Sequence, residues 1–157
     1  MYRSVIFGAV LAGASISSAA AQFAIDDIKV QLFKERAGAL SENIANAGRS
    51  FVNTTAGTGD VGDPADAMLV TLAFTGPRNS KASDKMARDI ASVTVTQMAK
   101  TGPRIMLKRA YGGFHFGADG RGHKAFWLDG ATCAPLEIEV RLGRSRKTAK
   151  LDFRCDG

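Results

Sequence analysis

The sequence is poor in the residues on which most recognisable chemical sites depend. It contains two cysteines, two histidines and one tryptophan among 157 residues. The cysteines are too far apart for a CxxC redox motif, and neither a GxSxG nor an SxxK serine motif occurs. No pair of carboxylates is placed by spacing alone for acid–base work. These absences favour a non-catalytic protein, although a site assembled from distant loops would leave no local signature.

The first 21 residues have the pattern of a secretory signal peptide. One cation precedes an apolar run, Val5 to Ile16, and alanines at positions 19–21 complete an Ala-x-Ala cleavage site. The run is too short to cross a bilayer as a helix, and no later run is long enough. We therefore expect a periplasmic or secreted protein whose mature chain, residues 22–157, has no transmembrane segment.

The mature chain is predicted to form a single all-β domain. Its length suits one core, and its apolar segments are separated by turn residues such as Gly, Pro, Asn and Asp. The candidate strands are 24–33, 39–44, 51–52, 68–74, 91–98, 104–111, 114–116, 123–128, 136–142 and 148–154. Only residues 83–90 are compatible with a turn or two of helix. The pattern predicts an antiparallel β-sandwich of about eight strands, immunoglobulin-like or similar.

The last two segments predict a hairpin. Apolar residues alternate along 136–142 and 149–153. The two apolar sets face each other if residues 143–146 form a four-residue turn, which places Val140 opposite Ala149.

The two cysteines lie just beyond the open end of this hairpin. In the predicted register Cys155 faces Ala134, one residue from Cys133, and a bulge at Pro135 would turn the two cysteines towards each other. An exported chain with an even cysteine count favours pairing, so we predict a structural Cys133–Cys155 disulfide.

Charge is unevenly distributed along the chain. Residues 22–99 carry 8 Lys/Arg against 9 Asp/Glu, whereas residues 100–157 carry 12 against 6. A basic half in an exported protein suggests anionic envelope components or another envelope protein as partners, and export disfavours nucleic acid. The alternative is a solvated surface that keeps the domain soluble.

The tip of the final hairpin is the candidate anion-binding site. Four cations lie there within seven residues: Arg141, Arg144, Arg146 and Lys147. Because the alternating core positions end at Leu142, we expect these side chains to point outward. The alternative is a charged turn that protects a terminal hairpin from edge-to-edge association.

Two sets of residues are weak metal-site candidates. Asp60, Asp63 and Asp66 lie three apart in a loop and offer carboxylates for Ca²⁺, but the spacing is not that of an EF-hand, and turns prefer these residues anyway.

The second set is a pair of histidines with an aspartate. His115 and His123 flank a glycine-rich turn that contains Asp119, a combination that could bind Zn²⁺ or Cu²⁺. The alternative is that His115, between two phenylalanines, is an ordinary polar residue on the outer face. No cofactor is indicated.

These observations predict a non-catalytic exported envelope accessory or binding domain of unknown ligand. The competing interpretation is a small secreted hydrolase or metal-dependent enzyme. We also expect Trp127, the only tryptophan, to be buried in the core.

Overall fold

The computed structural model describes residues 23–52, 62–65, 67–76 and 90–155, and this part of the chain forms nine strands and no helix. The strands are β1 (Ala24–Lys34), β2 (Ala39–Leu40), β3 (Ser50–Val52), β4 (Met68–Thr75), β5 (Ala91–Ala99), β6 (Gly102–Tyr111), β7 (Arg121–Leu128), β8 (Leu136–Leu142) and β9 (Ser145–Arg154). The signal-peptide segment lies outside the described residues, as does the segment 83–90 apart from Ile90. None of the described residues belongs to a helix that is long and apolar enough to cross a membrane.

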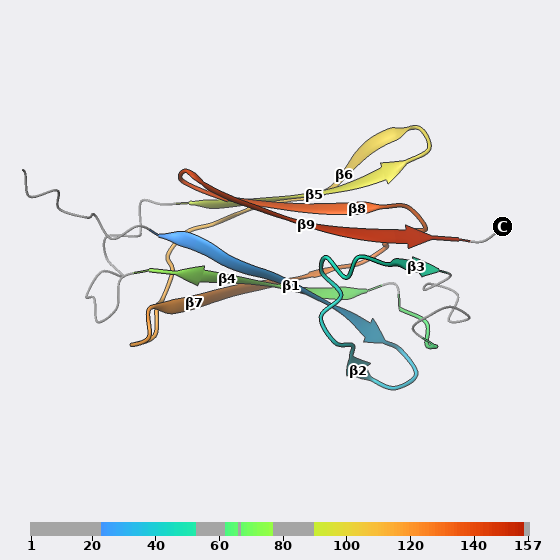
Figure 1. Ribbon diagram of the computed structural model, residues 1–157, viewed down its shortest axis with the longest axis horizontal. Coiled ribbons are helices and arrows are strands. Elements are labelled where there is room, and N and C mark those ends of the chain that lie inside the picture. Colours follow the sequence, from blue (N-terminus) through green and yellow to red (C-terminus); the bar gives the residue numbers. More distant parts are fainter. Residues whose placement is uncertain (1–22, 53–61, 66, 77–89, 156–157) are drawn as a thin grey trace, which may run out of the picture.

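The strands stack as two layers, which confirms the predicted all-β sandwich (Figure 1). One sheet has the order β2-β1-β4-β7 and the other the order β3-β9-β8-β5-β6. Neighbouring strands are antiparallel except for β3, which pairs in parallel with β9. The structure has nine strands where about eight were expected, and segments 39–44 and 51–52 contribute only short strands at the edges of the sheets.

The core lies between the two sheets because each strand turns every second side chain inward. In β4, which lies between β1 and β7, four buried residues alternate with four partly buried ones. The largest side chains with almost no exposure are Phe51, Phe74, Phe114, Ile28, Leu32, Met68, Leu72, Leu136, Ile138 and Leu151. Both sheets contribute to this set, so the strand periodicity read from the sequence does identify the core.

The final hairpin has a different register from the one predicted. Leu142 pairs with Ser145, so Gly143 and Arg144 form a two-residue turn in place of the predicted four-residue turn. Ile138, not Val140, is therefore opposite Ala149. Gly143 has a φ of 55°, and glycine is the residue preferred at the first position of a type II′ hairpin turn. The register is shifted by two residues, so every apolar side chain still faces the core.

The segment 114–116 is not a strand, which corrects a second expectation. The chain reverses in a tight turn in which the Gly117 amide donates to the Arg121 carbonyl at 2.8 Å. Phe114 nevertheless enters the core, where its ring packs edge-on against Phe74 with 4.6 Å between centroids. Strand β7 begins at Arg121, two residues earlier than expected.

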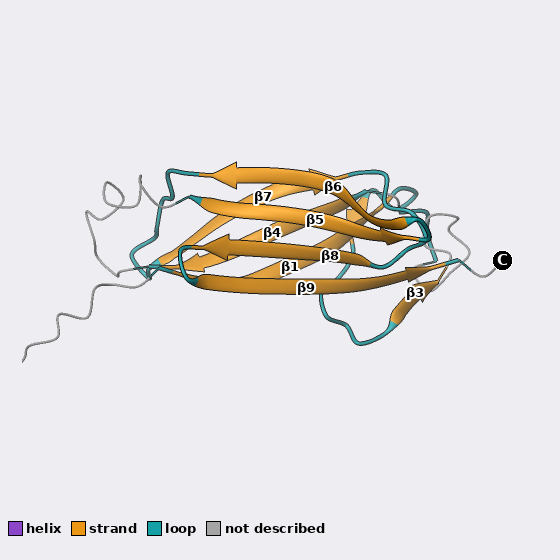
Figure 2. Cartoon of the chain, turned by 90° about the horizontal axis from the view of Figure 1, so that it is seen from above, coloured by secondary structure: helices purple, strands orange, loops and turns teal. Residues whose placement is uncertain are grey.

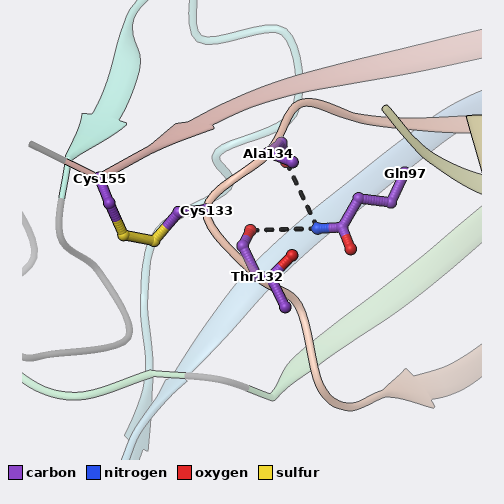
Figure 3. The surroundings of a disulfide bond; sticks show 5 residues. All are labelled: Gln97, Thr132, Cys133, Ala134 and Cys155. Atoms are coloured by element: carbon purple, nitrogen blue, oxygen red, sulfur yellow. Dashed lines mark hydrogen bonds between the residues drawn. A yellow bond between two sulfur atoms is a disulfide. The ribbon is translucent and has the colours of Figure 1, made fainter. Parts of the chain in front are cut away.

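The predicted disulfide is present at one end of the sandwich (Figure 3). Cys133 and Cys155 are bonded, with 5.2 Å between their Cα atoms. Gln97 of β5 is 2 % exposed, and its side-chain amide donates to the carbonyls of Thr132 and Ala134, at 3.1 and 3.5 Å. These two carbonyls lie on either side of Cys133, so the buried amide holds the loop that presents this cysteine to its partner.

The β5–β6 hairpin curls away from the four-stranded sheet (Figure 1). The ladder between the two strands shifts register at Met106, and such a bulge bends a strand pair. Strand β6 is at the edge of its sheet, as Figure 2 shows from above, and none of its ten residues is buried. Pairing of another strand with this free edge is disfavoured by Pro103, by the bulge and by the charge of Lys108.

Candidate functional site

The outer face of the five-stranded sheet, which is the face turned away from the core, is hollowed in two places. One hollow of about 630 Å³ lies near the disulfide and is here called the end groove, bordered among others by Arg49, Met98, Glu137, Lys150, Asp152 and Arg154. The other, of about 610 Å³, is here called the hairpin groove, bordered among others by Ser92, Thr94, Ile105, Lys108, Arg109, Glu139 and Arg141. Both volumes are in the range of small-molecule sites.

The hairpin groove is the more strongly cationic of the two. Lys108 and Arg141 border it together with one carboxylate, that of Glu139, whereas Arg109 pairs with the inward-facing Val93 and directs its side chain to the other side of β6. The Arg109 guanidinium also lies over the Phe126 ring, at 5.9 Å, so this side chain covers the gap between β6 and β7. Lys108 forms no ion pair within the described part of the chain, so its charge is available to a ligand.

Two arginines neutralise the carboxylate in the hairpin groove. Arg141 donates to Glu139, and Arg146 of β9 forms an ion pair with the same carboxylate. The hydrogen bond from Arg141 is the main cause that lowers the pKa of Glu139, and the same contact raises the pKa of Arg141. The charge of Glu139 is therefore compensated within the protein.

The end groove is closer to charge balance. Three cations, Arg49, Lys150 and Arg154, border it together with two carboxylates. Asp152 pairs with Arg154 and also accepts a hydrogen bond from Ser50, and these two contacts, the one with Arg154 first, lower the pKa of Asp152. Its charges are largely paired with each other, so this groove offers less to a charged ligand than the hairpin groove does.

The four predicted anion-binding cations at the tip point in different directions. Arg141 borders the hairpin groove and Arg146 lies beside it through Glu139, whereas Lys147 donates to the Asp26 carbonyl of β1. Arg144 is exposed in the turn and forms no ion pair among the described residues. The tip is thus not one cluster of free cations, because three of its four side chains have partners in the fold.

The aspartate loop is described only at its centre. Asp60 and Asp66 lie outside the described residues. Asp63 is 8 % exposed, and its two carboxylate oxygens accept hydrogen bonds from the amides of Arg36 and Ala37, at 2.9 and 3.1 Å. This carboxylate therefore caps the turn between β1 and β2.

Replacing Asp63 with alanine is expected to lower the free energy of unfolding by about 1–2 kcal/mol, because two partly buried amides lose their acceptors. Urea unfolding measures the change. Asp129→Ala is the matched control, since Asp129 is exposed and its loss is expected to cost less than about 0.5 kcal/mol. Equal stability of the two variants would contradict the capping role.

The histidine site predicted around the glycine turn is not assembled. His115, Asp119 and His123 are all exposed, and no group of three such side chains in the described ranges lies close enough to hold a metal ion. Asp119 instead accepts a hydrogen bond from the Arg121 amide at 3.0 Å, which stabilises the turn. The three residues are near each other in sequence, but their side chains do not converge.

The prediction that Trp127 is buried is wrong. Its neighbours in β7, Phe126 and Leu128, face the core, so Trp127 lies on the outer face of the four-stranded sheet and is 50 % exposed. Its ring contacts the edge of Phe33 of β1, with 6.0 Å between centroids and 86° between planes. Because Phe126, Trp127 and Leu128 are all apolar, polar and apolar residues do not alternate there, and the sequence pattern could not identify which of the three is exposed.

Of the cations that border the hairpin groove, Arg141 was predicted from the sequence, whereas Lys108 and Arg109 were not. A signal for these two cations existed, since no Asp or Glu occurs between residues 91 and 118, while this stretch contains Lys100, Arg104, Lys108 and Arg109.

A comparison with protein-family models gave no match, and a comparison with curated proteins gave none either.

Proposed function

We propose that this protein is a non-catalytic exported domain that binds anionic components of the cell envelope through the hairpin groove. The observation that carries the proposal is the charge of this groove, where Arg141 and Arg146 already pair with the one carboxylate, Glu139, and Lys108 forms no ion pair among the described residues. A ligand with phosphate, sulfate or carboxylate groups would meet an uncompensated positive field there.

The exposed apolar residue in the same groove supports this function. Ile105 is 57 % exposed and lies on β6 near Lys108. Cations beside an exposed aliphatic side chain suit an anionic surface that also has apolar parts, such as a membrane with acidic headgroups. Export itself rests on the predicted signal peptide.

The test is the charge reversal Lys108→Glu. It is expected to weaken binding to phosphatidylglycerol vesicles about thirtyfold, since each cation near an anionic surface contributes about 1 kcal/mol and reversal counts twice. Co-sedimentation at low salt measures the affinity, and added salt should abolish binding because the attraction is screened within about 8–10 Å. Dextran sulfate in place of vesicles distinguishes a glycan from a lipid as the source of the charge.

The matched control is Lys34→Glu, which makes the same change in net charge on the opposite sheet. It should bind nearly as well as the unmodified protein. Equal weakening by both variants would mean that net charge alone governs binding, and unchanged binding by Lys108→Glu would remove the hairpin groove as the site.

A further inference from the structure

The end of the β5–β6 hairpin exposes apolar side chains on the outer face of the five-stranded sheet. Met98 pairs with Pro103 across the hairpin, and the next outward pair is Thr96 with Ile105. These side chains lie on the face turned away from the core, because the neighbouring Gln97 is buried. Met98 is 52 % exposed, nearly as much as Ile105. Because the hairpin curls away from the four-stranded sheet (Figure 1), this end projects beyond the rest of the outer face.

The same hairpin is cationic. Lys100 in its turn and Arg104 and Lys108 on β6 are exposed, and none of them forms an ion pair among the described residues. The stretch from residue 91 to residue 111 contains no Asp or Glu, so the hairpin itself supplies no carboxylate. Arg104 lies opposite the buried Gln97 and points to the other side of β6, so a surface that meets the outer face contacts mainly Lys100 and Lys108.

The carboxylates on the outer face of this sheet are compensated by cations of the same face. Glu137 of β8, which pairs with β5 beside the hairpin end, forms an ion pair with Lys150 at 3.6 Å. Glu139 pairs with two arginines, and Asp152 pairs with one. The exposed Asp129 follows β7 of the opposite sheet. Within the described strands, the cations of the hairpin end therefore keep their charge for an external partner.

An anionic bilayer is the partner that suits this combination. Its acidic headgroups attract cations, and its interfacial region accepts aliphatic side chains while the ammonium of a lysine stays at the headgroups. A soluble anionic polymer would match the charge but offers no apolar phase. A second copy of the chain fits poorly, because a symmetric contact at this end would bring identical cations against each other.

We propose that the end of the β5–β6 hairpin inserts Met98 and Ile105 into the interface of an anionic membrane, with Lys100 and Lys108 at the headgroups. This inference rests on the proposed function, since Lys108 borders the hairpin groove, and it names the acidic bilayer as the partner. Such insertion reaches about 5–10 Å into the headgroup and acyl boundary. Two aliphatic side chains are too few to hold the protein without the charges, so insertion and electrostatic attraction act together.

The first test places a fluorescent reporter at the inserted position. The double variant Trp127→Phe with Ile105→Trp moves the only tryptophan to the hairpin end. With phosphatidylglycerol vesicles its emission should shift to shorter wavelength, and lipids brominated on the acyl chains should quench it. The unmodified protein is the control: Trp127 lies on the opposite sheet and should show neither effect. Vesicles of phosphatidylcholine alone should leave both proteins unchanged.

The second test removes the apolar side chain without changing the charge. Ile105→Ser should weaken co-sedimentation with phosphatidylglycerol vesicles about tenfold, since the exposed half of the side chain no longer leaves water on binding. Met98→Ser should act in the same direction. The matched control is Ile90→Ser, because Ile90 is 60 % exposed but precedes the opposite end of β5. It should bind like the unmodified protein. Melting temperatures verify that the variants are folded.

Dextran sulfate separates this inference from the proposed function. It presents anionic groups but no apolar phase, so Ile105→Ser should bind it as the unmodified protein does, whereas Lys108→Glu should bind it more weakly. If the tryptophan at the hairpin end shows no shift while Lys108→Glu still weakens vesicle binding, insertion is wrong and the anion-binding groove stands. If Lys108→Glu changes nothing, the groove itself is wrong.

Three further outcomes would overturn the insertion. One is equal weakening of vesicle binding by Ile105→Ser and Ile90→Ser, which would mean that overall hydrophobicity governs binding. Another is a loss of dextran sulfate binding in Ile105→Ser, which would assign this side chain to the shape of the groove. The third is an emission shift of the reporter variant that appears on raising the protein concentration without vesicles, which would mean that a second copy covers the hairpin end.

Discussion

Replacing Phe74 with alanine is expected to lower the free energy of unfolding by about 3–5 kcal/mol. Phe74 is fully buried on β4, and its ring packs edge-on against Phe114 at 4.6 Å. The truncation leaves a cavity and also removes an aromatic pair, which contributes about 0.5–1.5 kcal/mol beyond burial. Because the ring lies between rigid strands, the surrounding core can collapse only in part. Urea or guanidinium unfolding measures the change.

The control for this prediction is Trp127→Ala. It removes a larger side chain from the outer face of the same sheet, where half of the residue is already in water. Its cost should be well below that of Phe74→Ala. If the two variants lost similar stability, the assignment of inner and outer faces in the four-stranded sheet would be wrong.

Removal of the disulfide by Cys133→Ser with Cys155→Ser is expected to cost about 3 kcal/mol. The bond closes a loop across a sequence separation of 22 residues, and its loss increases the conformational entropy of the unfolded chain. The loss should appear as a lower denaturant midpoint, and reduction of the unmodified protein should give a change of the same size.

Gln97 provides an independent check of the same end of the molecule. Its amide donates to the Thr132 and Ala134 carbonyls, and these hydrogen bonds do not involve the sulfur atoms. We therefore expect the double serine variant to keep the native fold at moderate temperature. A reduced protein that is as stable as the oxidised one would contradict the structural role of the bond.

Strand positions and core faces followed from the sequence because alternation is a local property. The apolar residues of β8 and β9 point inward in the structure as they do in the pattern, and the two cysteines pair. The register of that hairpin did not follow. Shifting the pairing of two strands by two residues leaves every side chain on the same face. The pattern therefore allowed both a four-residue and a two-residue turn.

The sites depended on contacts that no spacing encodes. Two of the four cations at the tip form ion pairs with Glu139, and Lys147 donates a hydrogen bond to a carbonyl of β1. These contacts form because the folded strands place the partners within reach. The hairpin groove forms where β6 curls away from the sandwich, and its Lys108 lies near Arg141 of β8 although 33 positions separate them in sequence.

The sequence by itself therefore determined the all-β class, most strand positions, the inward faces and the disulfide, since each rests on local periodicity or on residue chemistry. Only the tertiary structure decided that Trp127 faces solvent against Phe33, that Asp63 caps a turn, and that His115 and His123 do not converge. These outcomes depend on which side of a strand faces the second sheet and on which loops meet. Long-range packing sets both.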